Sequence, residues 1–271
     1  ADTFKKNESA SPEFVHLASQ ALNARLLVEM GKASTYTSVE QLRRINSIKA
    51  SVLEGINEMV FTESGEIRSD SLTTNVMALR YGIVTESEQK DALSRKIAAT
   101  CEAMEPDHLF ETPAVAHGLL PLLSWAGYHD LAVKLVEKQD PETLSPVALV
   151  AISEWLISIV CGIDCTAAGF QRILIQPRIS NSGALTHAKA HYDSPHGSIH
   201  CAWKRLEDQL TYEVTIPPNT SATLRLVTNA DQVVTEAGQP IEGSGRFYAI
   251  KRWESQTSFI ATSGTYVFEV K

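Results

Sequence analysis

The sequence predicts an α+β protein in which a helical domain precedes an antiparallel β-sandwich domain. Up to about residue 168, apolar residues recur at steps of three and four, which is the spacing of an amphipathic helix. Beyond that point the step becomes two, as in strands that bury one face. We therefore place the helical domain at residues 1–168 and the sandwich at residues 169–271.

The composition is that of an ordinary globular protein and excludes some partners. The 271 residues are 44% apolar, and 24 Lys and Arg residues stand against 32 Asp and Glu residues, a net charge of −8. Nucleic-acid binding needs a basic surface, so we expect no nucleic-acid partner. No apolar run approaches the roughly 18 residues of a membrane helix, so we expect no membrane partner either. The first residues carry no signal-peptide core and no Met, which leaves extracytoplasmic and cytoplasmic locations both open.

The first two helices are predicted from their start signals. Ser11-Pro12 places Pro at the first helical position, and Gly31 is expected to end that helix. A capping box at Thr37 to Glu40 opens the second helix, and the polar residues 63–66 end it. The second helix carries one long apolar stripe formed by Val39, Leu42, Ile45, Ile48, Val52, Ile56 and Met59.

Five further helices are predicted before residue 162. A short one covers residues 72–81, and a capping box at Thr85 to Glu88 opens the next, with Leu93, Ile97, Cys101 and Met104 pointing inward. The last three cover residues 113–126, residues 129–138 and residues 145–160, with Gly127 and Gly162 as stop signals. Because the connections are short, neighbouring helices should run antiparallel as hairpins.

Strands are predicted from strict alternation of apolar and polar residues. The alternation is clearest over residues 210–216, 222–226 and 265–270. Short strands divided by regular turns are typical of an antiparallel sandwich or barrel. The turn signals are Ser194-Pro195-His196-Gly197, Pro217-Pro218-Asn219, Asn229-Ala230-Asp231 and Gly243-Ser244-Gly245. The first of them should close a tight hairpin.

Two loops collect carboxylates that would suit the acid and base of glycoside hydrolysis. One loop holds Glu63, Glu66 and Asp70, and the other holds Glu102, Glu105, Asp107, His108 and Glu111. Polar loops also collect acids merely because they are solvated, and we favour that interpretation over catalysis.

Glu154-Trp155 is a pair that often occurs in sugar sites, since an aromatic face stacks on a pyranose ring. Both residues lie in the middle of the last predicted helix, with Trp155 on the apolar stripe. We therefore expect Trp155 in the core and Glu154 on a flank of the helix.

Four histidines, His187, His191, His196 and His200, lie within fourteen residues. His187 and His191 share one strand face but would be about 13 Å apart at roughly 3.3 Å per residue, too far to bind one metal ion. We interpret these histidines as surface or ligand-facing polar residues.

The cysteines predict neither a metal site nor a cofactor site. Cys161 and Cys165 are four residues apart, and no second closely spaced pair accompanies them, as a zinc site would need. The sequence also has no Gly-rich phosphate loop, no nucleophile elbow and no zinc-protease motif. We expect no metal and no cofactor.

Three segments of the second domain resemble the C-terminal β-sandwich of bacterial α-L-rhamnosidases, glycoside hydrolase family 78. They are GALTHAKAHYDSPHG at 183–197, followed by Ile199 and Trp203, LTYEVTIPPNT at 210–220 and GFQRILIQP at 169–177. Residues 154–163 are similar to the last helix of that family's catalytic domain. The positions 108–109, 119–123, 127–128 and 131–132 resemble its later helices.

The resemblance implies an (α/α)6 toroid that hydrolyses terminal α-L-rhamnosides with inversion, using an acid and a base carboxyl on either side of a water molecule. A rhamnose-containing glycoside or polysaccharide would be the ligand. The full toroid needs twelve helices, and about seven are predicted here. The first domain is therefore expected to be a partial (α/α)6 barrel, formed by helical hairpins.

The chain departs from the family where the catalytic residues should lie. The acidic stretch that holds the family's general acid has no match. The interval from Gln139 to Ser145 is too short for the Trp-Glu-x-Trp loop that holds the general base. Ser145-Pro146 stands where the family has Asn-His, and Glu111-Thr112 stands where it has Thr-Gly. No catalytic residue is carried over, and His108 and Glu111 are the remaining candidates.

Three hypotheses about function follow from the sequence. The chain is part of a rhamnosidase whose other barrel half lies elsewhere, or a degenerate relative that binds sugar without cleaving it, or a structural or assembly module. A partial toroid would expose an apolar helical face, and a large exposed apolar patch usually marks an interface. We expect a homo-oligomer or a companion chain to cover that face, unless the helices close into a smaller bundle.

Overall fold

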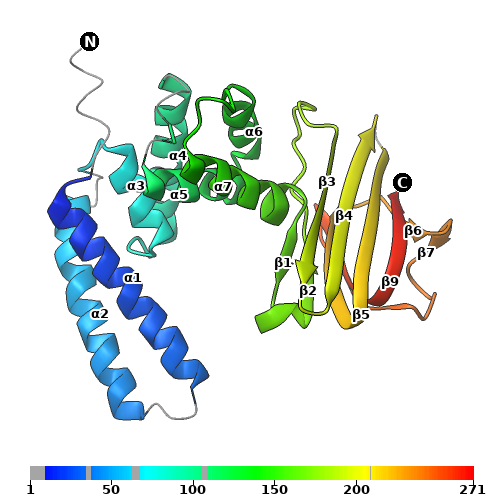
Figure 1. Ribbon diagram of the computed structural model, residues 1–271, viewed down its shortest axis with the longest axis horizontal. Helices are drawn as coiled ribbons and strands as arrows, with labels where there is room; N and C mark the ends of the chain where they lie inside the picture. Colours follow the sequence, from blue (N-terminus) through cyan, green and yellow to red (C-terminus); the bar gives the residue numbers. More distant parts are fainter. Residues whose placement is uncertain (1–9, 35–37, 63–67, 105–108, 111, 208) are drawn as a thin grey trace. The chain divides into compact units, whose positions relative to one another are not determined.

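The computed structural model describes residues 10–34, 38–62, 68–104, 109–110, 112–207 and 209–271 (Figure 1). Its contacts divide the chain into two compact units. The helical unit comprises Ala1–Leu131 and Gln139–Ala148, and the sheet unit comprises Ala132–Lys138 and Leu149–Lys271. A division of the domains at residue 168 follows the change from helix to strand, and it stays a prediction.

Each of the seven predicted helices is present in the described part of the chain. None of these helices is long and apolar enough to cross a membrane. Their bounds are α1 Pro12–Ala33, α2 Val39–Val60, α3 Leu72–Arg80, α4 Ser87–Ala103, α5 Pro113–Trp125, α6 His129–Glu137 and α7 Pro146–Trp155, which continues into the π-helical turn η3 Leu156–Val160.

Three helix-end predictions were wrong in detail. α1 runs past Gly31, which is buried and packed within the last turn, and it ends at Ala33. The capping box of α2 is formed by Ser38 and Gln41, one residue later than predicted. α4 begins after Glu86, whose side chain makes no capping hydrogen bond, so the box at Thr85 does not form. Neighbouring polar residues offer several cap positions, and the backbone path decides which one is used.

α1 and α2 form a long antiparallel hairpin (Figure 1). The stripe predicted on α2 is buried only toward its C-terminal end. Ile56 is fully buried, whereas Val39 is 66% exposed and Ile48 is 52% exposed. Two helices can bury only their shared seam, so apolar residues on their other faces meet solvent unless a third layer covers them.

The core of the helical unit lies among α3, α4 and α5. Gly118 on α5 faces α3, and a Cβ atom there would lie 2.6 Å from Cγ1 of Val76. Glycine therefore permits the close approach of these two helices. The most deeply buried residues of this core are Val76, Leu93, Ile97, Leu119, Leu120 and Leu123.

The strands form one mixed, hydrogen-bonded sheet. The main order is β1-β2-β5-β9-β6-β7, with β4 on β5, β3 on β4 and β8 on β9. Their bounds are β1 Ile163–Cys165, β2 Arg172–Ile175, β3 His187–Ser194, β4 Gly197–Leu206, β5 Gln209–Val227, β6 Val234–Glu236, β7 Gln239–Pro240, β8 Phe247–Arg252 and β9 Gln256–Val270.

The α+β class is confirmed, and one strand pair departs from the antiparallel expectation. β2 runs parallel to residues 221–224 of β5. β4 already occupies the same edge of β5 along residues 209–215. β2 therefore pairs with the part of that edge that β4 leaves free, and it runs in the same direction as β5.

A bend in β5 turns the sheet into a sandwich. Pro217-Pro218-Asn219 was predicted to separate two strands, but it lies inside β5 at a register shift between Ile216 and Ser221. Proline lacks a ladder donor and Asn219 has φ +61°, which together produce a bulge instead of a turn. Phe259 and Phe268 belong to opposite halves of β9, yet their ring centroids are 5.1 Å apart. The two halves of the sheet thus pack face to face.

Two predicted glycine positions are confirmed by their backbone angles. Gly162 ends the last helix with φ +73°, and a Cβ there would come within 2.2 Å of the Gln176 backbone. Gly197 follows the two-residue turn Pro195-His196 that closes the β3–β4 hairpin. Trp203 on β4 donates its indole N–H to the carbonyl oxygen of Val160, at 2.8 Å, and so ties η3 to the sheet.

Candidate functional site

The two catalytic candidates taken from the sequence, His108 and Glu111, lie outside the described residues. The same holds for Glu63, Glu66, Glu105 and Asp107 of the two acidic loops. Their catalytic roles stay predictions. Asp70 and Glu102 are the members of these loops that the structure describes.

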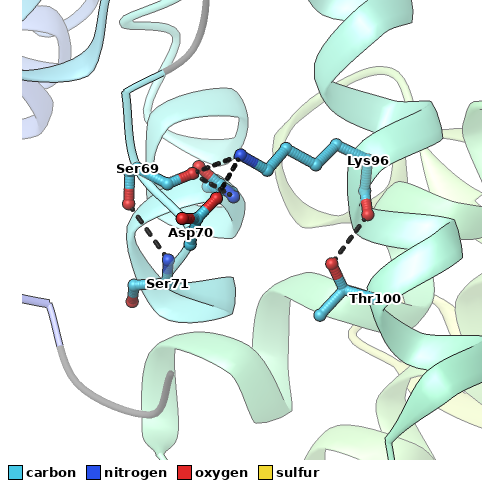
Figure 2. A network of polar contacts seen from close by, with 6 residues as sticks. Ser69, Asp70, Ser71, Lys96 and Thr100 are labelled. Carbon is cyan, nitrogen blue, oxygen red and sulfur yellow. Dashed lines mark hydrogen bonds and ion pairs between the residues drawn. The ribbon is translucent and has the colours of Figure 1, made fainter. Parts of the chain in front are cut away.

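Asp70 belongs to a polar network at the start of α3 (Figure 2). Lys96 on α4 donates to Oδ1 of Asp70 and to the carbonyl oxygen of Ser69, both at 2.8 Å. Hydrogen bonding and the charge of Lys96 lower the pKa of Asp70 below its ordinary value. An ionised carboxylate held by a lysine is a poor general acid, so this network serves to fix the segment that leads into α3.

The first turns of α3 bury an unusual number of polar side chains. Thr73, Thr74 and Asn75 are each at most 7% exposed. Asn75 donates its side-chain N–H to the carbonyl oxygen of Ser69, at 3.3 Å, while its Oδ1 has no hydrogen-bond partner within the described part of the chain. A buried amide oxygen of this kind can accept one hydrogen bond from a water molecule or a ligand hydroxyl.

A polar cavity of about 740 Å³ lies between the end of α2 and the start of α4. Glu58 and Glu86 bring two carboxylates to it, and Arg68 brings a guanidinium whose Nε donates to the Phe61 carbonyl oxygen at 2.9 Å. Such a set can bind sugar hydroxyl groups. Sequence reasoning missed it because the two glutamates are far apart in the chain and meet only in the folded unit. The described lining residues are Asn57, Glu58, Phe61, Thr62, Arg68, Ile83, Thr85, Glu86 and Gln89.

The Glu154-Trp155 pair is not a sugar site. Trp155 is only 2% exposed, so its ring belongs to the core as the apolar stripe indicated. Glu154 lies on the exposed side of the same helix. The ring is therefore closed to a sugar.

The histidines lie on the β3–β4 hairpin, and the register brings two of them together. His191 is directly opposite His200, while His187 is opposite Lys204. Reasoning along single strands missed this pair, although the hairpin turn at Pro195-His196 would have set the register. Among the described residues, no group of three His, Cys, Asp or Glu side chains has the geometry to hold a metal ion.

His187 lines a shallow depression of about 480 Å³ on the outer face of β3, β4 and β5. Ala202 on β4 is paired with Lys189 on β3 and with Glu213 on β5, so the small alanine side chain lies between two long polar ones. This placement agrees with the interpretation of His187 as a surface or ligand-facing residue.

The cysteines are free thiols. Burial raises the pKa of Cys101 and Cys161 to about 12, and it raises the pKa of Cys201 as well. The thiolate is the form of cysteine that acts as a nucleophile or binds a metal ion, and a raised pKa keeps these three buried residues in the thiol form. They are therefore unreactive in the folded protein.

Residues 162–240 match the family model described as the bacterial alpha-L-rhamnosidase C-terminal domain. This span begins at the glycine that ends the last helix and contains β1 to β7. The chain is similar to the C-terminal part of bacterial α-L-rhamnosidases over these residues. Within that part, the β3–β4 hairpin and the bend of β5 lie inside the matched residues.

Two curated rhamnosidases align with 82% and 95% of the chain. The α-L-rhamnosidase of Streptomyces avermitilis is 25% identical over 255 residues, covering 82% of this chain and 23% of that protein. The α-L-rhamnosidase of Formosa agariphila is 24% identical over 293 residues, covering 95% of this chain and 30% of that protein. The chain thus spans less than a third of the length of either protein.

The fold is also shared with a solved rhamnosidase. The crystal structure of Streptomyces avermitilis α-L-rhamnosidase complexed with L-rhamnose matches 98% of this chain and 28% of its own, with a TM-score of 0.80 and 20% identity. The match includes the helices as well as the sandwich. At this level of identity it establishes a shared fold and transfers no residue role.

Proposed function

We propose that the chain is the C-terminal portion of a carbohydrate-active protein of the rhamnosidase type, and that terminal α-L-rhamnosides are its ligand class. The observation that carries this proposal is the extent of the match to the enzyme solved with L-rhamnose, which reaches 98% of the chain. A match across both the helices and the sandwich supports common descent of the whole segment.

Hydrolysis with inversion requires two carboxyl groups about 6.5–9.5 Å apart, one to protonate the leaving oxygen and one to activate a water molecule. α6 ends at Glu137 and α7 begins at Pro146, so only residues 138–145 connect them. This is the connection in which the family resemblance places the general base. We infer that other helices, in a longer protein or a companion chain, supply the catalytic carboxylates.

The second candidate function is sugar binding without cleavage. The short connection between α6 and α7 favours it, because a chain that has lost the loop of the base can still keep its sugar contacts. The polar cavity with Glu58, Glu86 and Arg68 would provide such contacts in the helical unit.

The exposed apolar residues of the α1–α2 hairpin support an interaction with further helices. Leu26, Leu27 and Met30 on α1 are 47%, 51% and 67% exposed, and Val39 and Ile48 on α2 are exposed as well. We propose that a second copy or a companion chain covers this surface, as expected for a partial toroid.

The test of the proposal is hydrolysis of an aryl α-L-rhamnoside by the mass-verified chain, with an active rhamnosidase as positive control. We expect no release above the blank, because loss of one member of an acid–base pair alone typically costs about 10²–10⁴ in rate. Robust turnover would contradict the inference that other helices supply the carboxylates. It would make His108 and Glu111 the first residues to replace.

Binding of L-rhamnose without turnover, lost in Glu58→Gln or Glu86→Gln, would support the second candidate function. If the chain neither binds nor cleaves the sugar, the assembly role remains as the function of this portion.

A further inference from the structure

The sandwich carries an exposed tryptophan that none of the functions above uses. Trp253 follows β8 and is 47% exposed, whereas Trp203 in the same sheet unit is 2% exposed. Its neighbour in the chain is Glu254, so a tryptophan–glutamate pair stands here at the surface. An exposed tryptophan offers a large apolar face to a ligand, because covering the ring removes much apolar area from water.

The turn that carries Trp253 is held from several sides. Arg252 donates to Oε1 of Glu242 at 3.0 Å and to the carbonyl oxygen of Gln232 at 2.7 Å. The backbone N–H of Trp253 donates to the carbonyl oxygen of Gln256 at 2.9 Å. The backbone around the ring is thus fixed in advance, which lowers the entropy cost of binding a ligand.

The ring borders an open cavity of about 760 Å³, which Ala230 lines from the neighbouring turn. Glu254, Ser255 and Gln256 line it as well. Their side chains make no hydrogen bond or ion pair with other residues that the structure describes. A carboxylate, a hydroxyl and an amide around an aromatic face provide acceptors and donors for sugar hydroxyls and an apolar surface for the C–H face of a pyranose.

The charges at this place select a neutral ligand. Glu242 neutralises Arg252, with a contact of 2.5 Å between the charged groups. Glu254 and the exposed Asp231 add two carboxylates without a cationic partner within the described chain. A ligand that carries a carboxylate or a sulfate would meet like charge here.

We propose that Trp253, Glu254, Ser255 and Gln256, at the connection from β8 to β9, form a binding subsite for one pyranose unit of a neutral glycan. The C–H face of the sugar stacks on the indole ring, and its hydroxyl groups bond to Glu254 and Gln256. A terminal 6-deoxyhexose fits well, since its methyl group adds apolar contact with the ring. The choice of rhamnose as that sugar rests on the proposed function.

The test follows the indole N–H signals of the ¹⁵N-labelled chain by NMR while a neutral oligosaccharide ending in α-L-rhamnose is added. The chain has four tryptophans, so the signal of Trp253 is assigned from its loss in Trp253→Ala. We expect a saturable shift of that signal. Calorimetric titration with the same oligosaccharide should show binding at least about tenfold weaker in Trp253→Ala, as stacking on an aromatic ring contributes on that order. Trp125→Ala, which removes an exposed tryptophan of the helical unit, is the control and should bind normally.

Unchanged binding by Trp253→Ala, or equal binding of a galacturonate oligomer, would overturn the subsite. Absence of any shift with neutral oligosaccharides of rhamnose and of glucose would also overturn it. Binding of the glucose oligomer alone, still dependent on Trp253, would uphold the subsite and count against rhamnose in the proposed function.

Discussion

Gly197 shows at the scale of one residue why the β3–β4 hairpin needs glycine. Its φ is +123°, and a Cβ atom there would lie 3.1 Å from Cβ of Pro217. Gly197→Val is expected to lower the free energy of unfolding by about 1 kcal/mol or more, since the backbone angle and the close neighbour both oppose a side chain. Urea denaturation measures this loss. Ser198→Val, at the exposed next position of β4, is the control, and equal midpoints for the two variants would contradict the account.

The four thiols are expected to differ in reactivity because three are buried with raised pKa values. Cys165 is half-buried, while Cys101, Cys161 and Cys201 are buried. At pH 8 a thiol reagent should modify Cys165 first, and the other three only after unfolding, because so little of their thiolate forms near pH 8. Cys165→Ser should abolish the fast phase. A fast phase of undiminished size in that variant would show that a buried thiol is accessible.

At the scale of elements, the α1–α2 hairpin offers a matched pair of isoleucines on one helix. Ile56 is fully buried and Ile48 is 52% exposed. Ile56→Ala should therefore destabilise the protein by about 2–5 kcal/mol, as for other buried large-to-small changes, and Ile48→Ala by less than about 0.5 kcal/mol. Thermal or urea unfolding of both variants checks the difference. A large effect of Ile48→Ala would mean that a partner already covers that surface in solution.

Helices, helix ends and turns were predicted well where residues close together in the sequence determine them. The helical spacing of apolar residues in α2, the glycine after η3 and the Pro195-His196 turn are signals within a few residues of the chain. The structure has a helix, a helix end and a hairpin turn at these places. The bend of β5 and the parallel pairing of β2 were missed because they depend on which edge of a strand is still free. Residues 217–219 look like a turn in sequence and become a bulge only because β9 pairs with β5 on both sides of them.

The candidate sites were harder to predict for the same physical reason. Glu58 and Glu86 border one cavity although 28 positions separate them in the sequence. His191 and His200 become neighbours only through the hairpin register. For Trp253 a local signal existed, since a tryptophan and a glutamate adjoin a turn between strands, but burial had to be known to separate it from Glu154-Trp155.

For the whole molecule, the central claim is that these helices are part of a larger toroid and need a partner surface. Light scattering on the purified chain, combined with binding of a hydrophobic dye, tests it most directly. The account predicts either a species heavier than the 29.7 kDa monomer or a monomer whose exposed apolar residues bind the dye. A stable 29.7 kDa monomer that binds no dye would contradict the partial toroid and favour a closed helical bundle.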